Sequence, residues 1–154
     1  MRDMTAVDRS YRVLIVEDDQ DDLVLLDRAL RRACEAMGIG VELSCSVNGF
    51  DALSTVARGD LTSRLPDVVV IDLNMPVMGG ELFLRRLRGE FGLGNVPAVV
   101  LTTSSEKPIH AAALSSGADY VFVKPNSFAE LLVIANKVIE VAQVGERSTR
   151  AFCC

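Results

Sequence analysis

The chain has 154 residues, enough for one domain with a single core, and 49% of them are hydrophobic although tryptophan is absent. Its net charge of −5 argues against a nucleic-acid-binding protein, because nothing would replace the counterions along the phosphates. No apolar stretch approaches the roughly 18 residues that a membrane span needs, and residues 1–11 lack the apolar segment of a signal peptide. We therefore expect a cytoplasmic protein that binds neither nucleic acid nor a membrane.

Short runs rich in Val, Ile and Leu predict five β-strands, and segments with helical spacing of apolar residues alternate with them. The predicted strands cover residues 13–16, 41–47, 68–71, 98–101 and 120–123. The predicted helices are marked by Leu23, Leu26, Leu30 and Met37; by Ala52, Leu53 and Val56; by Phe83, Leu87 and Phe91; by the sparsely apolar residues 110–114; and by Leu131, Ile134, Val138 and Val141. Ser127 and Glu130 have the spacing of a capping box, and Gly38 and Gly117 stand at predicted helix ends.

This alternation predicts an α/β fold with a parallel sheet, right-handed crossovers and helices on both faces. The second strand differs from the others, because Val41, Leu43, Cys45 and Val47 alternate with Glu42, Ser44 and Ser46. One polar face is typical of an edge strand and favours the flavodoxin-like, doubly wound order 2-1-3-4-5. In that order the first and third strands are neighbours at the switch point, where such sheets bind their ligands.

Charged and hydroxyl side chains follow four of the predicted strands at their carboxyl ends. The first strand runs into Glu17-Asp18-Asp19, the third into Asp72, the fourth into Thr102-Thr103 and the fifth into Lys124. A helix-cap or turn role would account for Asp72 alone, but not for the gathering of all these groups at one edge. We expect the chemistry of the protein at this edge.

These residue types together predict a phosphoryl-transfer site. Clustered carboxylates raise one another's pKa unless a cation intervenes, and Mg²⁺ prefers oxygen ligands and usually accompanies a phosphate. Lys124 offers a positive charge to a phosphoryl oxygen, and Thr102 offers a hydroxyl. Asp72 would be the nucleophile, with stabilisation of charge as the main catalytic contribution.

Four motifs carry these residues: Val-Leu-Ile-Val-Glu-Asp-Asp at 13–19, Ile-Asp-Leu-Asn-Met-Pro at 71–76, Leu-Thr-Thr-Ser at 101–104 and Phe-Val-Lys-Pro at 122–125. In this order and at these spacings the chain resembles the receiver domain of two-component response regulators. The amino-acid sequence of the second and third motifs, together with the extended segment 58–66, is most similar to that of stand-alone regulators that serve bacteriophytochrome-type histidine kinases.

The resemblance implies a role for each residue. Asp72 would accept the phosphoryl group from a histidine kinase, phytochrome-type or otherwise, or from a phosphotransfer protein. Asp18 would bind Mg²⁺ directly, Glu17 would act on it through water, and Asn74 would offer its backbone carbonyl. Thr102 would be the switch hydroxyl, and Lys124 would contact the phosphoryl group. The chain would be a signalling protein that assists its own phosphorylation and dephosphorylation, not an enzyme.

Some positions depart from the family pattern. Val121 stands where an aromatic switch residue is usual, and Tyr120 is expected to point to the other face of a regular strand. Coupling of Thr102 to an aromatic side chain is therefore not expected. Gly79 replaces a common aspartate, beside Gly80, which we expect to keep the turn flexible.

The four cysteines lack metal-ligand spacing. Cys34 and Cys45 occupy apolar positions and are expected in the core. Cys153 and Cys154 are interpreted as part of an unstructured end without a role.

We expect an N-terminal arm at 1–10, a receiver domain at 11–144 and a short tail at 145–154 without an output domain. The signal would then leave through a surface that phosphorylation alters. The expected surface is the fourth helix, fifth strand and fifth helix, roughly residues 108–144, which would pair two receivers or dock a partner.

Three other functions fit the sequence less well. Aspartyl-phosphate phosphatases and phosphotransferases usually carry a second acid where this chain has Asn74, and they tend to have a cap insertion. A pseudo-receiver that only docks partners is disfavoured by the intact acidic pair, Thr102 and Lys124. FMN binding is disfavoured because no phosphate loop rich in Ser, Thr and Gly follows the first strand.

Overall fold

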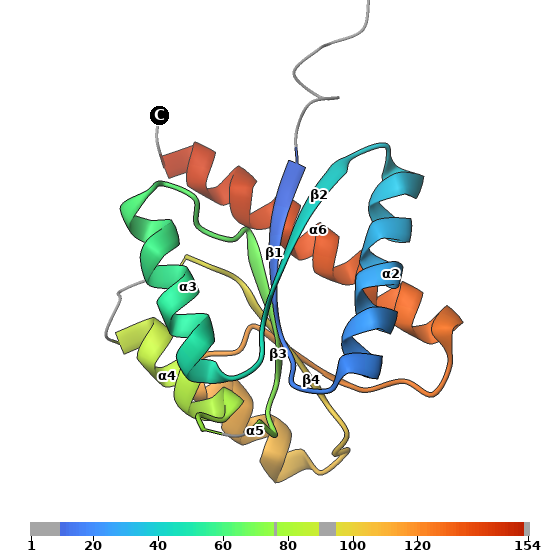
Figure 1. The fold of residues 1–154 in the computed structure, drawn as a ribbon, viewed down its shortest axis with the longest axis vertical. Helices are drawn as coiled ribbons and strands as arrows, with labels where there is room; N and C mark the ends of the chain where they lie inside the picture. Colours follow the sequence, from blue (N-terminus) through green and yellow to red (C-terminus); the bar gives the residue numbers. More distant parts are fainter. Residues whose placement is uncertain (1–9, 76, 90–94, 153–154) are drawn as a thin grey trace, which may run out of the picture.

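The computed structural model of the chain describes residues 10–75, 77–89 and 95–152, with side chains up to residue 144. Its centre is a five-stranded parallel sheet in the order β2-β1-β3-β4-β5, with helices on both faces (Figure 1). The strands are β1 (Ser10–Val16), β2 (Gly40–Ser46), β3 (Val68–Asp72), β4 (Ala98–Thr102) and β5 (Tyr120–Val123). The helices are α2 (Gln20–Met37), α3 (Gly49–Leu61), α4 (Gly80–Gly89), α5 (Lys107–Ser116) and α6 (Phe128–Phe152). The predicted flavodoxin-like fold and its strand order are therefore confirmed.

Two apolar layers lie against the two faces of the sheet. On one face, α2 and α6 pack against strand side chains such as Ile15. On the other face, α3, α4 and α5 cover side chains such as Leu14. Successive residues of a strand point to opposite faces, so Leu14 and Ile15 enter different layers. Every residue of β3 and β4 is buried, because these inner strands need cover from both layers.

The edge position predicted for the second strand is confirmed, but three of the side chains predicted for it differ from expectation. Cys45 and Val47 are exposed instead of lying on the buried face, whereas Ser46, expected on the polar face, is fully buried. The layer under α2 includes Val41 and Leu43 and does not extend to Cys45. Ser46 lies on the opposite side of the strand, where α3 packs against β2. Cys34 is buried in α2, as predicted.

The helix ends follow from local hydrogen bonding. Asp19 caps α2, because its carboxylate accepts hydrogen bonds from two backbone N–H groups of the first turn. Gly38 ends α2 with φ of 70°, a left-handed conformation that glycine adopts without a steric cost. Before α6, the Oγ of Ser127 accepts a hydrogen bond of 3.2 Å from the backbone N–H of Glu130, which is one half of the predicted capping box.

The described elements run from β1 to α6. β1 begins at Ser10, and the backbone of α6 continues past residue 144 to Phe152. Phe91, residues 1–9, and the pair Cys153 and Cys154 lie outside the described residues. Within the part of the chain that the structure describes, no helix has both the length and the apolar character needed to cross a bilayer.

Candidate functional site

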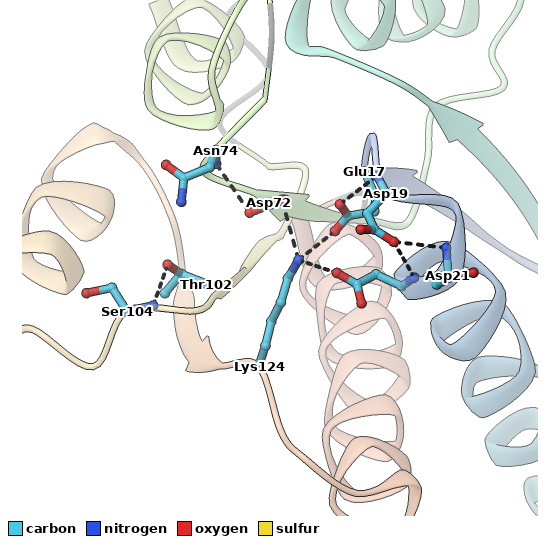
Figure 2. A network of polar contacts seen from close by, with 9 residues as sticks. Glu17, Asp19, Asp21, Asp72, Asn74, Thr102, Ser104 and Lys124 are labelled. Atoms are coloured by element: carbon cyan, nitrogen blue, oxygen red, sulfur yellow. Dashed lines mark hydrogen bonds and ion pairs between the residues drawn. The ribbon is translucent and has the colours of Figure 1, made fainter.

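The sheet brings the predicted charged residues together at the carboxyl ends of its strands. Glu17 directly follows β1, and Asp72 is the last residue of β3. Val16 of β1 is paired with Ile71 of β3, so the residues that follow them, Glu17 and Asp72, lie side by side. Figure 2 shows Lys124 reaching toward both carboxylates from the segment after β5.

Three carboxylates form a cluster at this edge. One oxygen each from Glu17, Asp18 and Asp72 lie within 4.8 Å of one another. Glu17 and Asp72 are buried, whereas Asp18 is exposed to solvent. An oxygen-only donor set with one side open to water fits Mg²⁺, which keeps several of its waters when a protein binds it.

Lys124 balances part of this negative charge. Its Nζ lies 3.0 Å from Oε2 of Glu17, 2.9 Å from Oδ2 of Asp22 and 3.4 Å from Oδ2 of Asp72. Burial lowers the pKa of Lys124, but the hydrogen bonds to Asp22 and Glu17 and the nearby charges outweigh it and hold the pKa above its ordinary value. The ammonium group is therefore charged at neutral pH.

The carboxylate of Asp22 was not predicted as part of the site. It lies in the first turn of α2 and not at a strand end, which is why attention to strand ends alone missed it. A signal was present in the sequence, because the helix that follows a strand starts at the same edge of the sheet. An acidic residue in its first turn is therefore a candidate for that edge.

Burial raises the pKa of Glu17 to about 7. The hydrogen bond from Lys124 and the backbone N–H of Asp19 act in the opposite direction, and the charge of Asp72 raises the pKa further. The expectation that clustered carboxylates disfavour one another's charged form therefore holds for Glu17.

Asn74 and Thr102 are held near the cluster by short local hydrogen bonds. The backbone N–H of Asn74 donates to Oδ1 of Asp72 at 3.2 Å. The Oγ1 of Thr102 accepts a hydrogen bond of 3.2 Å from the N–H of Ser104, so this buried hydroxyl is engaged in its own loop (Figure 2). The backbone N–H of Lys124 donates to the carbonyl of Thr102 at 2.7 Å, which links the ends of β4 and β5.

Gly80, expected to keep its turn flexible, has a different role. It is buried at the start of α4, and a Cβ added there would lie 2.6 Å from the backbone oxygen of Asp72. No side chain fits without a shift of the backbone that carries Asp72. The absence of a side chain thus permits close packing of α4 against the end of β3.

Val121 and Tyr120 lie on opposite faces of β5, as predicted. Val121 packs in the layer that faces α3, α4 and α5, whereas Tyr120 stacks on Phe122 on the opposite side of β5. A cavity of about 550 Å³ lies beside Thr102, lined also by Ser104, Ile109 and residues of α4. Among the described residues that line this cavity beside the Thr102 hydroxyl, none is aromatic.

Comparisons with known proteins agree with this fold and identify the family. The sequence model of the response regulator receiver domain matches residues 13–136. The chain belongs to the response regulator receiver domain family. Receiver domains of this family act in two-component signalling, where histidine kinases phosphorylate them.

The transcriptional regulatory protein PrrA of Mycobacterium tuberculosis is 38% identical over 123 residues, which are 80% of this chain and 47% of PrrA. This chain thus spans about half the length of the curated relatives that it matches. Among solved structures, the response regulator RPA3017 in red light signalling of R. palustris is 27% identical, with a TM-score of 0.70. That match covers 82% of this chain and 90% of RPA3017. The phosphorylated cyanobacterial phytochrome response regulator RcpA has a TM-score of 0.75 over 86% of this chain and 93% of its own, and its 22% identity supports the fold alone.

Proposed function

We propose that this receiver domain accepts a phosphoryl group on Asp72 and passes the signal on through a protein contact surface. The observation that carries the proposal is the position of the Asp72 carboxylate, which is buried, clustered with the carboxylates of Glu17 and Asp18 and 3.4 Å from the ammonium group of Lys124. A nucleophile beside a candidate cation site and a positive charge is suited to phosphoryl transfer.

In the proposed reaction an oxygen of Asp72 attacks the phosphorus of a phosphohistidine in a histidine kinase or phosphotransfer protein. The bond between phosphorus and the imidazole nitrogen breaks, and the nitrogen keeps the electron pair. Glu17, Asp18 and Asp72, with the backbone carbonyl of Asn74, would hold Mg²⁺. When bound, Mg²⁺ would neutralise the charge of the carboxylates and of the incoming phosphoryl oxygens.

Lys124 and Thr102 would contact the new phosphoryl group. The ammonium group of Lys124 is already 3.4 Å from Asp72 and would form a charge-assisted contact with a phosphoryl oxygen. The hydroxyl of Thr102 would leave its hydrogen bond with Ser104 and donate to another phosphoryl oxygen. An interaction present only in the phosphorylated form is what can shift the population of states.

The partner that we propose is a histidine kinase of the phytochrome type. Its support is the likeness to RPA3017, which acts in red light signalling and shares 27% identity with this chain. Because the match covers 90% of RPA3017, we further propose that this receiver acts as a single-domain regulator. The intact mass of the protein purified from its own cells would test this second point, since a fused output domain would roughly double it.

Phosphorylation of Asp72 can be tested directly with acetyl phosphate as the donor. The wild-type chain incubated with acetyl phosphate and Mg²⁺ should gain the mass of one phosphoryl group, and removal of Mg²⁺ by EDTA should abolish the gain. Asp72→Asn should gain none, because an amide is too weak a nucleophile. Equal uptake by the Asp72→Asn variant would show that another residue is the acceptor.

A further inference from the structure

Asp22 makes the shortest contact of Lys124 with any described carboxylate. Its Oδ2 lies 2.9 Å from Nζ, against 3.0 Å for Glu17 and 3.4 Å for Asp72. The backbone N–H of Asp22 donates to the carboxylate of Asp19 at 3.0 Å, so the residue is part of the capped first turn of α2. The contact with Lys124 therefore ties α2 to the segment after β5.

The hydrogen-bonding capacity of Lys124 is fully used in this arrangement. An ammonium group has three N–H donors, and the three contacts lie on three different carboxylates. A phosphoryl group on Asp72 adds oxygens that also attract this ammonium group. We expect the approach of Lys124 to these oxygens to weaken its contact with Glu17 or Asp22.

The exposure of the two other partners decides which contact is released. The side chain of Glu17 is 7% exposed, and an unpaired charge at such a position is costly. The side chain of Asp22 is 44% exposed, so water can replace Lys124 at a small cost. Of these two contacts of Lys124, the one with Asp22 therefore costs less to lose.

We propose that Asp22 is a positioning residue that holds Lys124 toward α2 in the unphosphorylated receiver and competes with the phosphoryl group for it. The inference rests on the proposed phosphorylation of Asp72. It gives Asp22 an effect opposite to that of Lys124: the carboxylate lowers the affinity of the site for a phosphoryl group. Removing its charge should strengthen phosphoryl binding while Lys124 is kept.

The first test is the affinity of the full chain for beryllium fluoride, a phosphoryl mimic, measured by calorimetry in Mg²⁺. Asp22→Asn should bind it about threefold more tightly than wild type, the size expected when one partly exposed ion pair no longer competes. Asp21→Asn is the matched control, because Asp21 is an exposed carboxylate of the same helical turn. It removes the same charge without touching Lys124 and should change the affinity less.

The second test follows Lys124 itself. The sequence has three lysines, Lys107, Lys124 and Lys137, so the side-chain resonances of labelled lysine are readily assigned. In wild type, beryllium fluoride should move the Lys124 resonance as the ion pair with Asp22 breaks. In Asp22→Asn this resonance should already differ before beryllium fluoride is added, and in Asp21→Asn it should match wild type.

The outcomes separate this inference from the proposed function. Unchanged or weaker binding by Asp22→Asn, or an equal gain in Asp21→Asn, would overturn the role of Asp22 and leave phosphorylation of Asp72 intact. Failure of the wild-type chain to take up phosphate from acetyl phosphate would overturn the proposed function itself. A Lys124 resonance unaffected by Asp22→Asn would show that the ion pair does not position the lysine.

Discussion

At the scale of single residues, the carboxylates of the site differ in whether they already have hydrogen-bond or ion-pair partners. Both oxygens of Glu17 have partners, since Oε2 lies 3.0 Å from Lys124 and Oε1 accepts a hydrogen bond of 3.1 Å from the N–H of Asp19. Asp18 is exposed, and its carboxylate makes no hydrogen bond with the described residues. The direct binding of a metal by Asp18, with Glu17 acting through water, stays a prediction.

Metal binding should therefore depend more on Asp18 than on Glu17. We expect Asp18→Ala to weaken Mg²⁺ binding well beyond tenfold and Glu17→Ala to weaken it by about tenfold, because the first loses a ligand and the second an outer partner. Calorimetric titration with Mg²⁺ measures both, with Asp21→Asn as the control for a general loss of negative charge. Wild-type Mg²⁺ affinity in Asp18→Ala would remove Asp18 from the metal site.

The raised pKa of Glu17 predicts a pH dependence of stability in the metal-free protein. The folded state binds this proton with a pKa of about 7, against the ordinary 4.5, so protonation favours folding. This stabilisation is complete below about pH 4.5 and is lost as the pH rises through about 7, by on the order of 3 kcal/mol.

Urea denaturation in EDTA, compared between wild type and Glu17→Gln across this range, measures the effect. The variant cannot ionise at this position, so its free energy of unfolding should rise relative to wild type as the pH increases. A constant difference between the two proteins would contradict the raised pKa.

At the scale of elements, Arg88 joins three segments at the edge of the sheet opposite the site. Its guanidinium donates to the carbonyl of Val96 at 2.6 Å and to that of Gly117 at 3.0 and 3.1 Å. It also lies 3.1 Å from the carboxylate of Asp119, which in turn accepts a hydrogen bond of 2.8 Å from the N–H of Ala98. The end of α4 is thereby tied to the start of β4 and to the turn between α5 and β5.

Loss of this side chain should destabilise the whole domain. We expect Arg88→Ala to lower the free energy of unfolding by about 2 kcal/mol, because partly buried carbonyls lose a charged donor. Arg85→Ala is the control on the same helix, since the Arg85 side chain is 64% exposed and should contribute less than about 0.5 kcal/mol. Thermal or urea unfolding compares the two variants, and an equal effect would show that the Arg88 contacts add little.

At the scale of the whole molecule, the expected output surface has the features of a region whose conformation can change. Only Ala113 and Ser116 of α5 are buried, so this helix is held by few contacts. Apolar side chains are exposed along α5, β5 and α6, among them Leu114, Val123 and Val133. The backbone link between Thr102 and Lys124 connects this region to the site.

Phosphorylation should therefore alter hydrogen exchange across α5, β5 and the part of α6 before residue 144. We expect beryllium fluoride with Mg²⁺ to change amide protection there, while α3 serves as an internal reference that changes little. Changes confined to the loop after Asp72 would exclude this output surface. Pairing of two receivers through the same surface stays a prediction, and sedimentation with and without beryllium fluoride would measure it.

Most of the architecture could be predicted from the amino-acid sequence, because it depends on local patterns. Short β-branched runs become buried strands, the polar alternation of residues 42–46 indicates an edge, and parallel strands bring their carboxyl ends to one side. The sequence therefore predicts a cluster at the carboxyl ends of the strands, and the structure brings together its members Glu17, Asp18, Asp72 and Lys124.

Other features were decided only by the tertiary structure. Asp22 reaches Lys124 because the packing of α2 against α6 sets where its first turn lies, and no local pattern encodes a contact between residues 102 positions apart. Cys45 is exposed because the layer under α2 ends at Leu43, and Gly80 is required because α4 approaches the backbone of Asp72. Sequence patterns determine which face of an element is buried, whereas contacts between elements depend on the angles and distances at which those faces pack.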